Sequence, residues 1–181
     1  MKKIFLLVNL CFAVCFNRQQ KLFAQDSTRI RISLLTCSPG EELYASFGHS
    51  ALRVIDSNAV TDIIYNYGTF DFDDPDFYSK FVRGKLFYAL SIERPEDFLY
   101  SYHAENRSVT EQVLDIAQPE ALAIKHFLAE NIKEEKRWYK YDFVRDNCTT
   151  RLRDILVKLK KPAPQLPPVM PLDFTFRNAI H

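Results

Sequence analysis

Short segments with alternating apolar residues are the feature that most restricts how this chain can fold. Residues 29–36, RIRISLLT, place Ile30, Ile32 and Leu34 on one side of an extended chain and polar residues on the other, which is the pattern of a half-buried strand. Further strand-like segments cover residues 49–55, 62–68, 85–93, 107–116 and 137–143. The sequence therefore predicts a sheet of several short strands.

Predicted helices lie between these strands at irregular intervals. Pro95 suits the first turn of a helix over residues 94–106, and residues 119–132 have the spacing of an amphipathic helix. The apolar face predicted for the second helix contains Leu122, Phe127, Leu128 and Ile132. Because strands and helices do not alternate strictly, we expect an α+β fold with an antiparallel sheet packed on a helix.

The chain divides into three parts. Residues 1–24 begin with two lysines and an apolar run from Ile4 to Phe16, which indicates a bacterial export signal, with a retained N-terminal anchor as the alternative. Residues 25–162 are long enough for one domain with a single hydrophobic core. Residues 163–181 contain several prolines and are expected to form a tail outside that domain.

Charge and motif content exclude several classes of function. The formal net charge is +1, which argues against a nucleic-acid-binding surface. Glycine-rich phosphate loops and paired Cys or His ligand spacings are absent from the sequence, so we expect no cofactor and no metal ion. Aromatic residues make up 14% of the chain, and most of them are expected to pack in the core; a groove for acyl chains is the alternative.

Cys148 stands at the start of a predicted helix in the segment YDFVRDNCTTRLRDIL, residues 141–156. Asp146 and Asn147 before it are suitable N-cap residues, and the apolar residues after it recur at helical spacing. A thiol at this position lies near the positive end of the helix dipole, which favours the thiolate. Cys148 is therefore a candidate nucleophile.

His49 and Asn66 are the candidate partners of this thiol. His49 follows Gly48 at the start of a predicted strand, and Asn66 lies in the next strand, where asparagine is otherwise unfavourable. If the two strands pair antiparallel, both side chains can share a face, so that Asn66 holds one imidazole nitrogen and leaves the other for Cys148. A surface histidine and a solvated edge-strand asparagine are the alternatives. His103 and His126 lie on predicted helices and are interpreted as ordinary helix residues.

Cys37 provides a different interpretation of Cys148. These are the two cysteines that remain after the predicted signal segment, and in an oxidising compartment they could form a disulfide. The domain would then be a non-catalytic part of the cell envelope.

Several blocks of the sequence together resemble a known family. LLTCSPGEELYASFGHSALRV, YNYGTFDF, FYSKFVRGKLFYALS, NRSVTEQVLDI and YDFVRDNCTTRLRDIL are similar to the periplasmic domain of the Bacteroidota lipoprotein N-acyltransferases, formerly a domain of unknown function. The resemblance covers residues 29 to about 160. There is also a more distant resemblance in the order of residues along the chain. The histidine comes first and Asn-Cys at a helix start comes last, as in the circularly permuted papain-like enzymes, including the permuted NlpC/P60 group.

The resemblance implies a thiol acyltransferase domain over residues 25–162, with Cys148 as nucleophile, His49 as base and Asn66 as the third polar residue. It further implies a phospholipid acyl donor, a lipoprotein acceptor amine and a position at the inner-membrane surface in the periplasm. A cell-wall peptidase or amidase using the same residues is the alternative enzyme. Members of the family often continue into a membrane-embedded part, whereas this sequence ends at His181. The sequence is therefore expected to be either a truncated protein or a stand-alone form.

Overall fold

The computed structural model of the protein describes residues 29–70, 76–83 and 86–165. The predicted signal segment and most of the predicted tail lie outside these residues. The described residues form an α+β fold, as predicted, with a six-stranded antiparallel sheet in the order β5-β1-β2-β3-β4-β6. The strands are β1 (Ile30–Cys37), β2 (His49–Asp56), β3 (Thr61–Thr69), β4 (Phe87–Glu93), β5 (Val109–Val113) and β6 (Trp138–Lys140).

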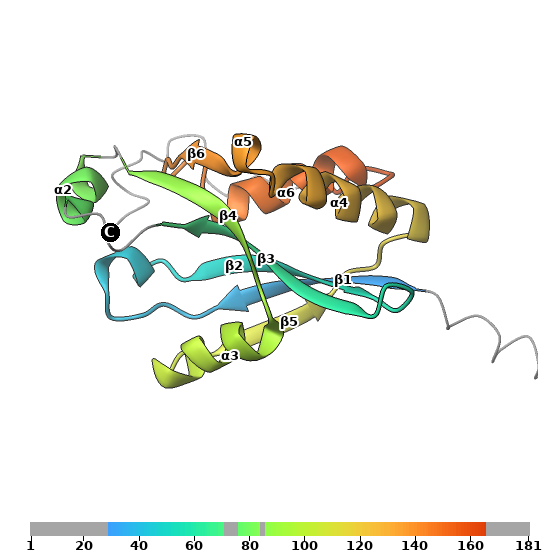
Figure 1. Cartoon of the computed structure of the whole chain (residues 1–181), viewed down its shortest axis with the longest axis horizontal. Coiled ribbons are helices and arrows are strands. Elements are labelled where there is room, and N and C mark those ends of the chain that lie inside the picture. Colours follow the sequence, from blue (N-terminus) through green and yellow to red (C-terminus); the bar gives the residue numbers. More distant parts are fainter. Residues whose placement is uncertain (1–28, 71–75, 84–85, 166–181) are drawn as a thin grey trace, which may run out of the picture.

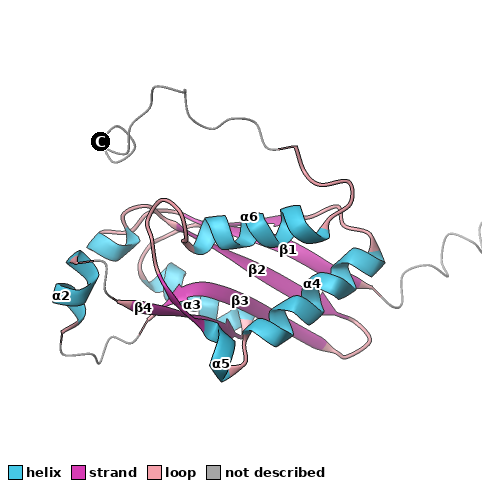
Figure 2. Cartoon of the chain, turned by 90° about the horizontal axis from the view of Figure 1, so that it is seen from above, coloured by secondary structure: helices cyan, strands magenta, loops and turns pink. Residues whose placement is uncertain are grey.

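Helices cover both faces of the sheet (Figures 1 and 2). The described helices are the 3₁₀ turn η1 (Leu43–Ala45), α2 (Phe77–Val82), α3 (Pro95–Ala104), α4 (Gln118–Asn131), α5 (Glu134–Arg137) and α6 (Cys148–Leu159). Both α4 and α6 lie on one face of the sheet, and α3 lies on the other. Pro95 occupies the first turn of α3, as predicted, because its fixed φ suits that position.

The turn between β2 and β3 is built around Asp56. Its Oδ1 accepts hydrogen bonds from the backbone N–H groups of Asn58 and Ala59, at 2.9 and 3.2 Å, which closes the turn locally. Its Oδ2 pairs with Lys125 on α4. Asp56 therefore connects the turn to α4. The antiparallel pairing of β2 with β3 begins directly beside the turn.

The prediction that β1 is a half-buried strand is wrong in one respect. Ile30 and Ile32 face the larger core under α4 and α6, as the alternation indicates. However, Leu35 and Cys37 on the opposite face are also buried, 2% and 3% exposed, and pack in a second cluster with Phe98 of α3. The sheet is thus covered on both faces around β1, which the polar residues at the start of the strand do not indicate.

The apolar face predicted for α4 also needs correction. The residues buried against the sheet are Ala121, Ile124 and Leu128, whereas Leu122 is 45% exposed. Leu128 was predicted correctly, and Phe127 packs only partly against the core. Ala121, Ile124 and Leu128 recur at helical spacing, so they form the buried stripe, and Leu122 lies outside it.

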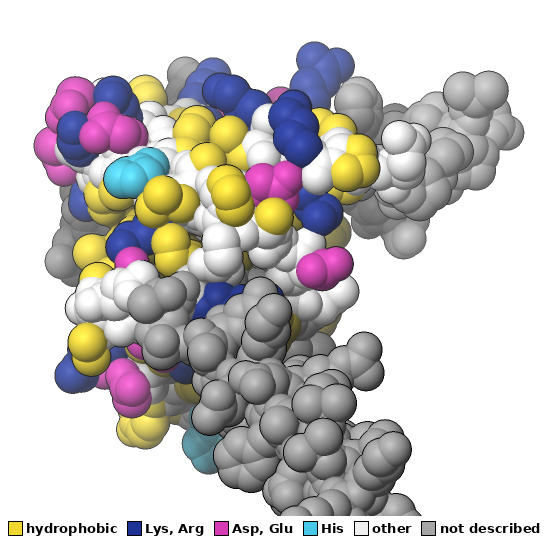
Figure 3. All heavy atoms as spheres, turned by 90° about the vertical axis from the view of Figure 1, so that its right-hand side faces the viewer, with side chains coloured by type: hydrophobic (Ala, Val, Ile, Leu, Met, Phe, Trp, Pro, Cys, Tyr) yellow, Lys and Arg dark blue, Asp and Glu magenta, His cyan; other side chains and the backbone are white. Residues whose placement is uncertain are grey.

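The surface carries charges of both signs. At the right-hand end of the molecule as drawn in Figure 1, Lys and Arg side chains are intermixed with Asp, Glu and apolar side chains (Figure 3). Within the described residues, every helix is too short or too polar to span a lipid bilayer.

Candidate active site

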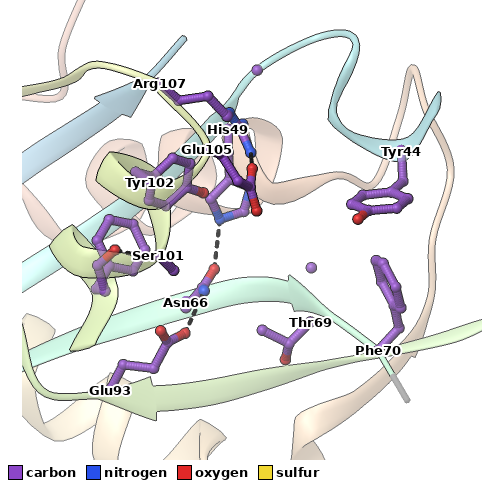
Figure 4. Close-up of a pocket in the computed structure, with 13 residues that line it drawn as sticks. Tyr44, His49, Asn66, Thr69, Phe70, Glu93, Ser101, Tyr102, Glu105 and Arg107 are labelled. Atoms are coloured by element: carbon purple, nitrogen blue, oxygen red, sulfur yellow. Dashed lines mark hydrogen bonds and ion pairs between the residues drawn. The ribbon is translucent and has the colours of Figure 1, made fainter. Parts of the chain in front are cut away.

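His49 and Asn66 lie side by side on one face of the sheet (Figure 4). β2 and β3 pair in the register that places Leu52 opposite Tyr65, so Asn66 is a diagonal neighbour of His49 on the same face. Nε2 of His49 and Oδ1 of Asn66 are 2.5 Å apart. Nδ2 of Asn66 donates a hydrogen bond of 2.6 Å to Oε1 of Glu93 at the end of β4. The imidazole is therefore held by a hydrogen-bonded chain that crosses three strands.

Gly68 leaves room beside the imidazole. It lies where the register of β3 with β4 shifts, and its φ of +98° is a conformation that favours glycine. A Cβ at this position would lie 3.6 Å from Cε1 of His49, 3.7 Å from Cβ of Cys148 and 3.9 Å from Oη of Tyr139. The side chains of His49, Cys148 and Tyr139 therefore surround the position that a Cβ would occupy. Since glycine has no Cβ, this space between them stays open.

The first turn of α6 positions Cys148. Asn147 is the N-cap: its Oδ1 accepts from the Thr150 N–H at 2.9 Å, and the Asn147 N–H donates to Oγ1 of Thr150 at 2.8 Å. The hydroxyls of Ser50 and Thr149, 3.2 Å apart, connect this turn to β2. The positive end of the helix dipole lies at this first turn and favours a thiolate at Cys148.

Cys148 and His49 shift the pKa of each other in the directions that favour a thiolate and an imidazolium. Burial alone would raise the pKa of the Cys148 thiol, but the hydrogen bond and charge of His49 and the backbone N–H of Ser50 lower this pKa to about 7. Burial alone would lower the pKa of His49, but Cys148 and Asn66 raise it. Since Asn66 engages Nε2, the ring nitrogen left for Cys148 is Nδ1.

A cavity of about 310 Å³ opens beside His49 (Figure 4). One wall is aromatic, with the rings of Tyr44 and Phe70 5.5 Å apart. The opposite wall is largely polar and comes from α3 and the residues after it: Ser101, Tyr102, Glu105 and Arg107. Among the described residues, no group of three or more His, Cys, Asp or Glu side chains is arranged to hold a metal ion.

A second cavity, of about 520 Å³, is mostly aromatic. It is lined by Phe81, Leu86, Tyr88, Lys140, Tyr141, Asp142 and Phe143. Tyr141 stacks on Tyr88 at 4.3 Å, and its hydroxyl interacts with Cys148: burial first, and then the cysteine, raise the pKa of Tyr141. Tyr141 therefore lines this aromatic groove and also interacts with Cys148.

The structure brings the three predicted site residues, Cys148, His49 and Asn66, together. His103 and His126 are exposed on α3 and α4, in agreement with their interpretation as helix residues. Cys37 and Cys148 are both buried and both free, so the disulfide left open by the sequence is not formed. The domain is therefore not held together by a Cys37–Cys148 crosslink.

Sequence reasoning missed Glu93 and Tyr141. Glu93 ends a strand that is predicted correctly, but its contact with Asn66 depends on the register of β3 with β4, which pairs Asn66 with Ser91. Tyr141 stands seven residues before Cys148, and only the turn between β6 and α6 places its hydroxyl at the sulfur. One signal in the sequence could have indicated Glu93: it is a carboxylate at the end of a predicted strand, at the two-residue spacing of side chains that share a face of a sheet.

The pKa of Cys148 predicts how pH controls its alkylation. Iodoacetamide reacts with thiolates, so the rate of labelling should be half-maximal near pH 7, below the ordinary thiol value of about 8.5. Cys37 is the internal control, because burial raises its pKa to about 11 and it should stay unlabelled at that pH. Peptide mapping by mass spectrometry measures both sites. A midpoint for Cys148 at or above about 8.5 would contradict the thiolate–imidazolium pair.

Comparison with known proteins identifies the family. No curated protein and no solved structure gave a significant match to the chain. The family model of the Lnb N-terminal periplasmic domain matches residues 19–178, which is most of the chain and includes every residue of the site described above. The match agrees with the resemblance found in the sequence blocks and with a periplasmic location, and the chain belongs to the Lnb N-terminal periplasmic domain family.

Proposed function

We propose that the domain is a cysteine-dependent acyltransferase that moves an acyl group from a phospholipid to the N-terminal amine of a lipoprotein at the inner-membrane surface. The observation that carries this proposal is the pairing of Cys148, whose pKa is about 7, with an imidazole held by Asn66. A thiolate next to an imidazolium is the arrangement that nucleophilic cysteine chemistry requires. The chain order, with base before nucleophile, resembles that of the permuted papain-like enzymes.

In the first half-reaction the Cys148 thiolate attacks the ester carbonyl carbon of the phospholipid. The C–S bond forms and the carbonyl electrons move to oxygen, where the backbone N–H of Cys148 is a suitable donor. The Tyr139 hydroxyl is a second candidate donor, since it has no hydrogen-bond partner among the described residues and lies next to Gly68. The C–O bond then breaks, and the lysophospholipid oxygen takes the proton of the His49 imidazolium, which leaves a thioester.

In the second half-reaction the acceptor amine attacks the thioester carbonyl. His49, now neutral, accepts the proton that the amine loses, and the C–S bond breaks to return the Cys148 thiolate. The product is an amide. The enzyme ends with the same thiolate–imidazolium pair with which it began, so no oxidant, reductant or metal enters the balance.

Exposed apolar side chains around the site support a lipid substrate. Phe47 is 64% exposed, Phe143 is 47% exposed, and their rings are 6.0 Å apart. Val144 beside them is 36% exposed, and Phe143 also lines the aromatic groove that contains Tyr141. Exposed apolar side chains that lie together in this way mark a surface that contacts a membrane, a ligand or another protein. The occupant that best fits the groove is a fatty-acyl chain.

Hydrolysis of cell-wall peptides is the second candidate. The observation in its favour is the polar wall of the cavity beside His49, which carries Glu105 and Arg107 and would suit a charged peptide. Both reactions would use Cys148 and His49. They differ in the fate of the acyl group, because a transferase must hold the thioester until an amine arrives.

Withholding the acceptor separates the two candidates. With phospholipid vesicles and no amine, we expect the intact mass of the protein to increase by one fatty-acyl group, which hydroxylamine removes. Cys148→Ala should prevent the increase, and Cys37→Ala, which removes the other described thiol, should retain it. A soluble short-chain thioester serves as a second donor. If neither donor acylates Cys148 and the protein cleaves muropeptides, the peptidase replaces the acyltransferase.

A further inference from the structure

Glu93 is the outermost member of the hydrogen-bonded chain that begins at Cys148. Its Oε1 accepts the 2.6 Å hydrogen bond from Nδ2 of Asn66 (Figure 4). The same oxygen lies 3.5 Å from the hydroxyl of Ser91. Glu93 belongs to β4, whereas Asn66 belongs to β3 and His49 to β2. Three adjacent strands therefore contribute one residue each to a line of polar side chains that ends at the sulfur.

The chemistry of these groups leaves a single arrangement of protons. A carboxylate only accepts hydrogen bonds, so the side of the Asn66 amide that faces Glu93 must be the NH₂ group. The carbonyl oxygen of Asn66 must then face His49. Because that oxygen is also only an acceptor, Nε2 of His49 must carry a proton. In the neutral imidazole, Nδ1 is consequently the unprotonated nitrogen that can accept the thiol proton of Cys148.

Without a carboxylate at position 93 this arrangement of protons is no longer the only one that the side chains allow. The oxygen and nitrogen of an asparagine amide have nearly the same shape, so Asn66 could turn over and present its NH₂ group to Nε2 of His49. That orientation favours the tautomer with the proton on Nδ1, which cannot accept a proton from Cys148. Asn66 by itself holds the ring in place but does not determine which nitrogen is the base.

We infer that Glu93 is a positioning residue that determines the tautomer of His49 by orienting the amide of Asn66. This inference rests on the proposed function only in that His49 is the base for Cys148. Asn66 is 8% exposed, and the acceptor that its NH₂ group contacts within the described residues is Glu93. The role of Glu93 is to select one of two otherwise similar amide orientations.

The tautomer can be measured without acyl transfer. In a Cys148→Ala background no thiolate keeps the imidazole charged, and the ¹⁵N shifts of His49 at alkaline pH distinguish the two neutral tautomers. We expect the proton on Nε2 in this background. Adding Glu93→Gln, whose amide can donate or accept, should populate both tautomers. An unchanged tautomer in the Glu93→Gln protein would overturn the inference, whatever the activity of the domain.

Kinetics provide the second readout. With Cys148 present, Glu93→Gln should slow acylation by the short-chain thioester about tenfold to a hundredfold, the range found for the outer partners that orient metal-ligating histidines. Glu96→Gln, the same change at an exposed position on α3, should have no effect. In an Asn66→Ala background Glu93→Gln should add nothing, because the connecting amide is gone. Independent, multiplicative effects of the two changes would also overturn the inference.

Discussion

Replacing His49 with alanine is expected to slow acylation of Cys148 by about 10²- to 10⁴-fold, the contribution of a positioned general acid–base group. The hydrogen bond and charge of His49 are the main influences that lower the pKa of Cys148 against burial. Without them, burial should move this pKa above the ordinary thiol value. The midpoint of iodoacetamide labelling should therefore rise well above pH 7, together with the loss of turnover.

The folded structure should tolerate the same substitution. The loss of His49 leaves Oδ1 of the buried Asn66 without its partner, which costs about 1–3 kcal/mol of unfolding free energy. The matched controls are His103→Ala and His126→Ala, which change exposed histidines on α3 and α4 and should leave both the rate and the labelling midpoint unchanged. Full activity of the His49→Ala protein, or loss of activity in either control, would assign the base to another residue.

The largest effect on stability is expected from Leu152→Ala. Leu152 lies one turn after Cys148 on α6, is 2% exposed and belongs to the core cluster beneath α4 and α6. Truncating a fully buried leucine removes its transfer free energy and leaves a cavity, at a cost of about 2–5 kcal/mol. For a domain of this size that corresponds to a decrease in Tm of roughly 10 °C.

Leu122→Ala on α4 is the matched control for this change. The same atoms are removed, but Leu122 is 45% exposed, so the unfolding free energy should change by less than about 0.5 kcal/mol. Urea denaturation of both variants measures the difference. Equal costs at the two positions would contradict the packing of α6 on the sheet, and with it the placement of Cys148 beside β2.

The sequence predicted the individual parts of the site well. The helix that begins at Cys148 follows from Asn147, because an N-cap side chain and the first helical turn lie within four residues of one another. The common face of His49 and Asn66 follows from the two-residue period of a strand and from the short turn between β2 and β3. Each of these features depends on residues that are close along the chain.

The tertiary structure alone decided how these parts meet. Glu93 contacts Asn66 because β3 and β4, joined by a connection that includes α2, pair in one particular register. The space at Gly68 becomes part of the site only because α6, far along the chain, packs over β2 and β3. The same packing buries Ala121 rather than Leu122, and α3 covers the face of β1 that carries Cys37. Local periodicity is determined by backbone geometry and can be predicted from a few residues, whereas register and helix packing minimise the free energy of the whole core and depend on all of its residues together.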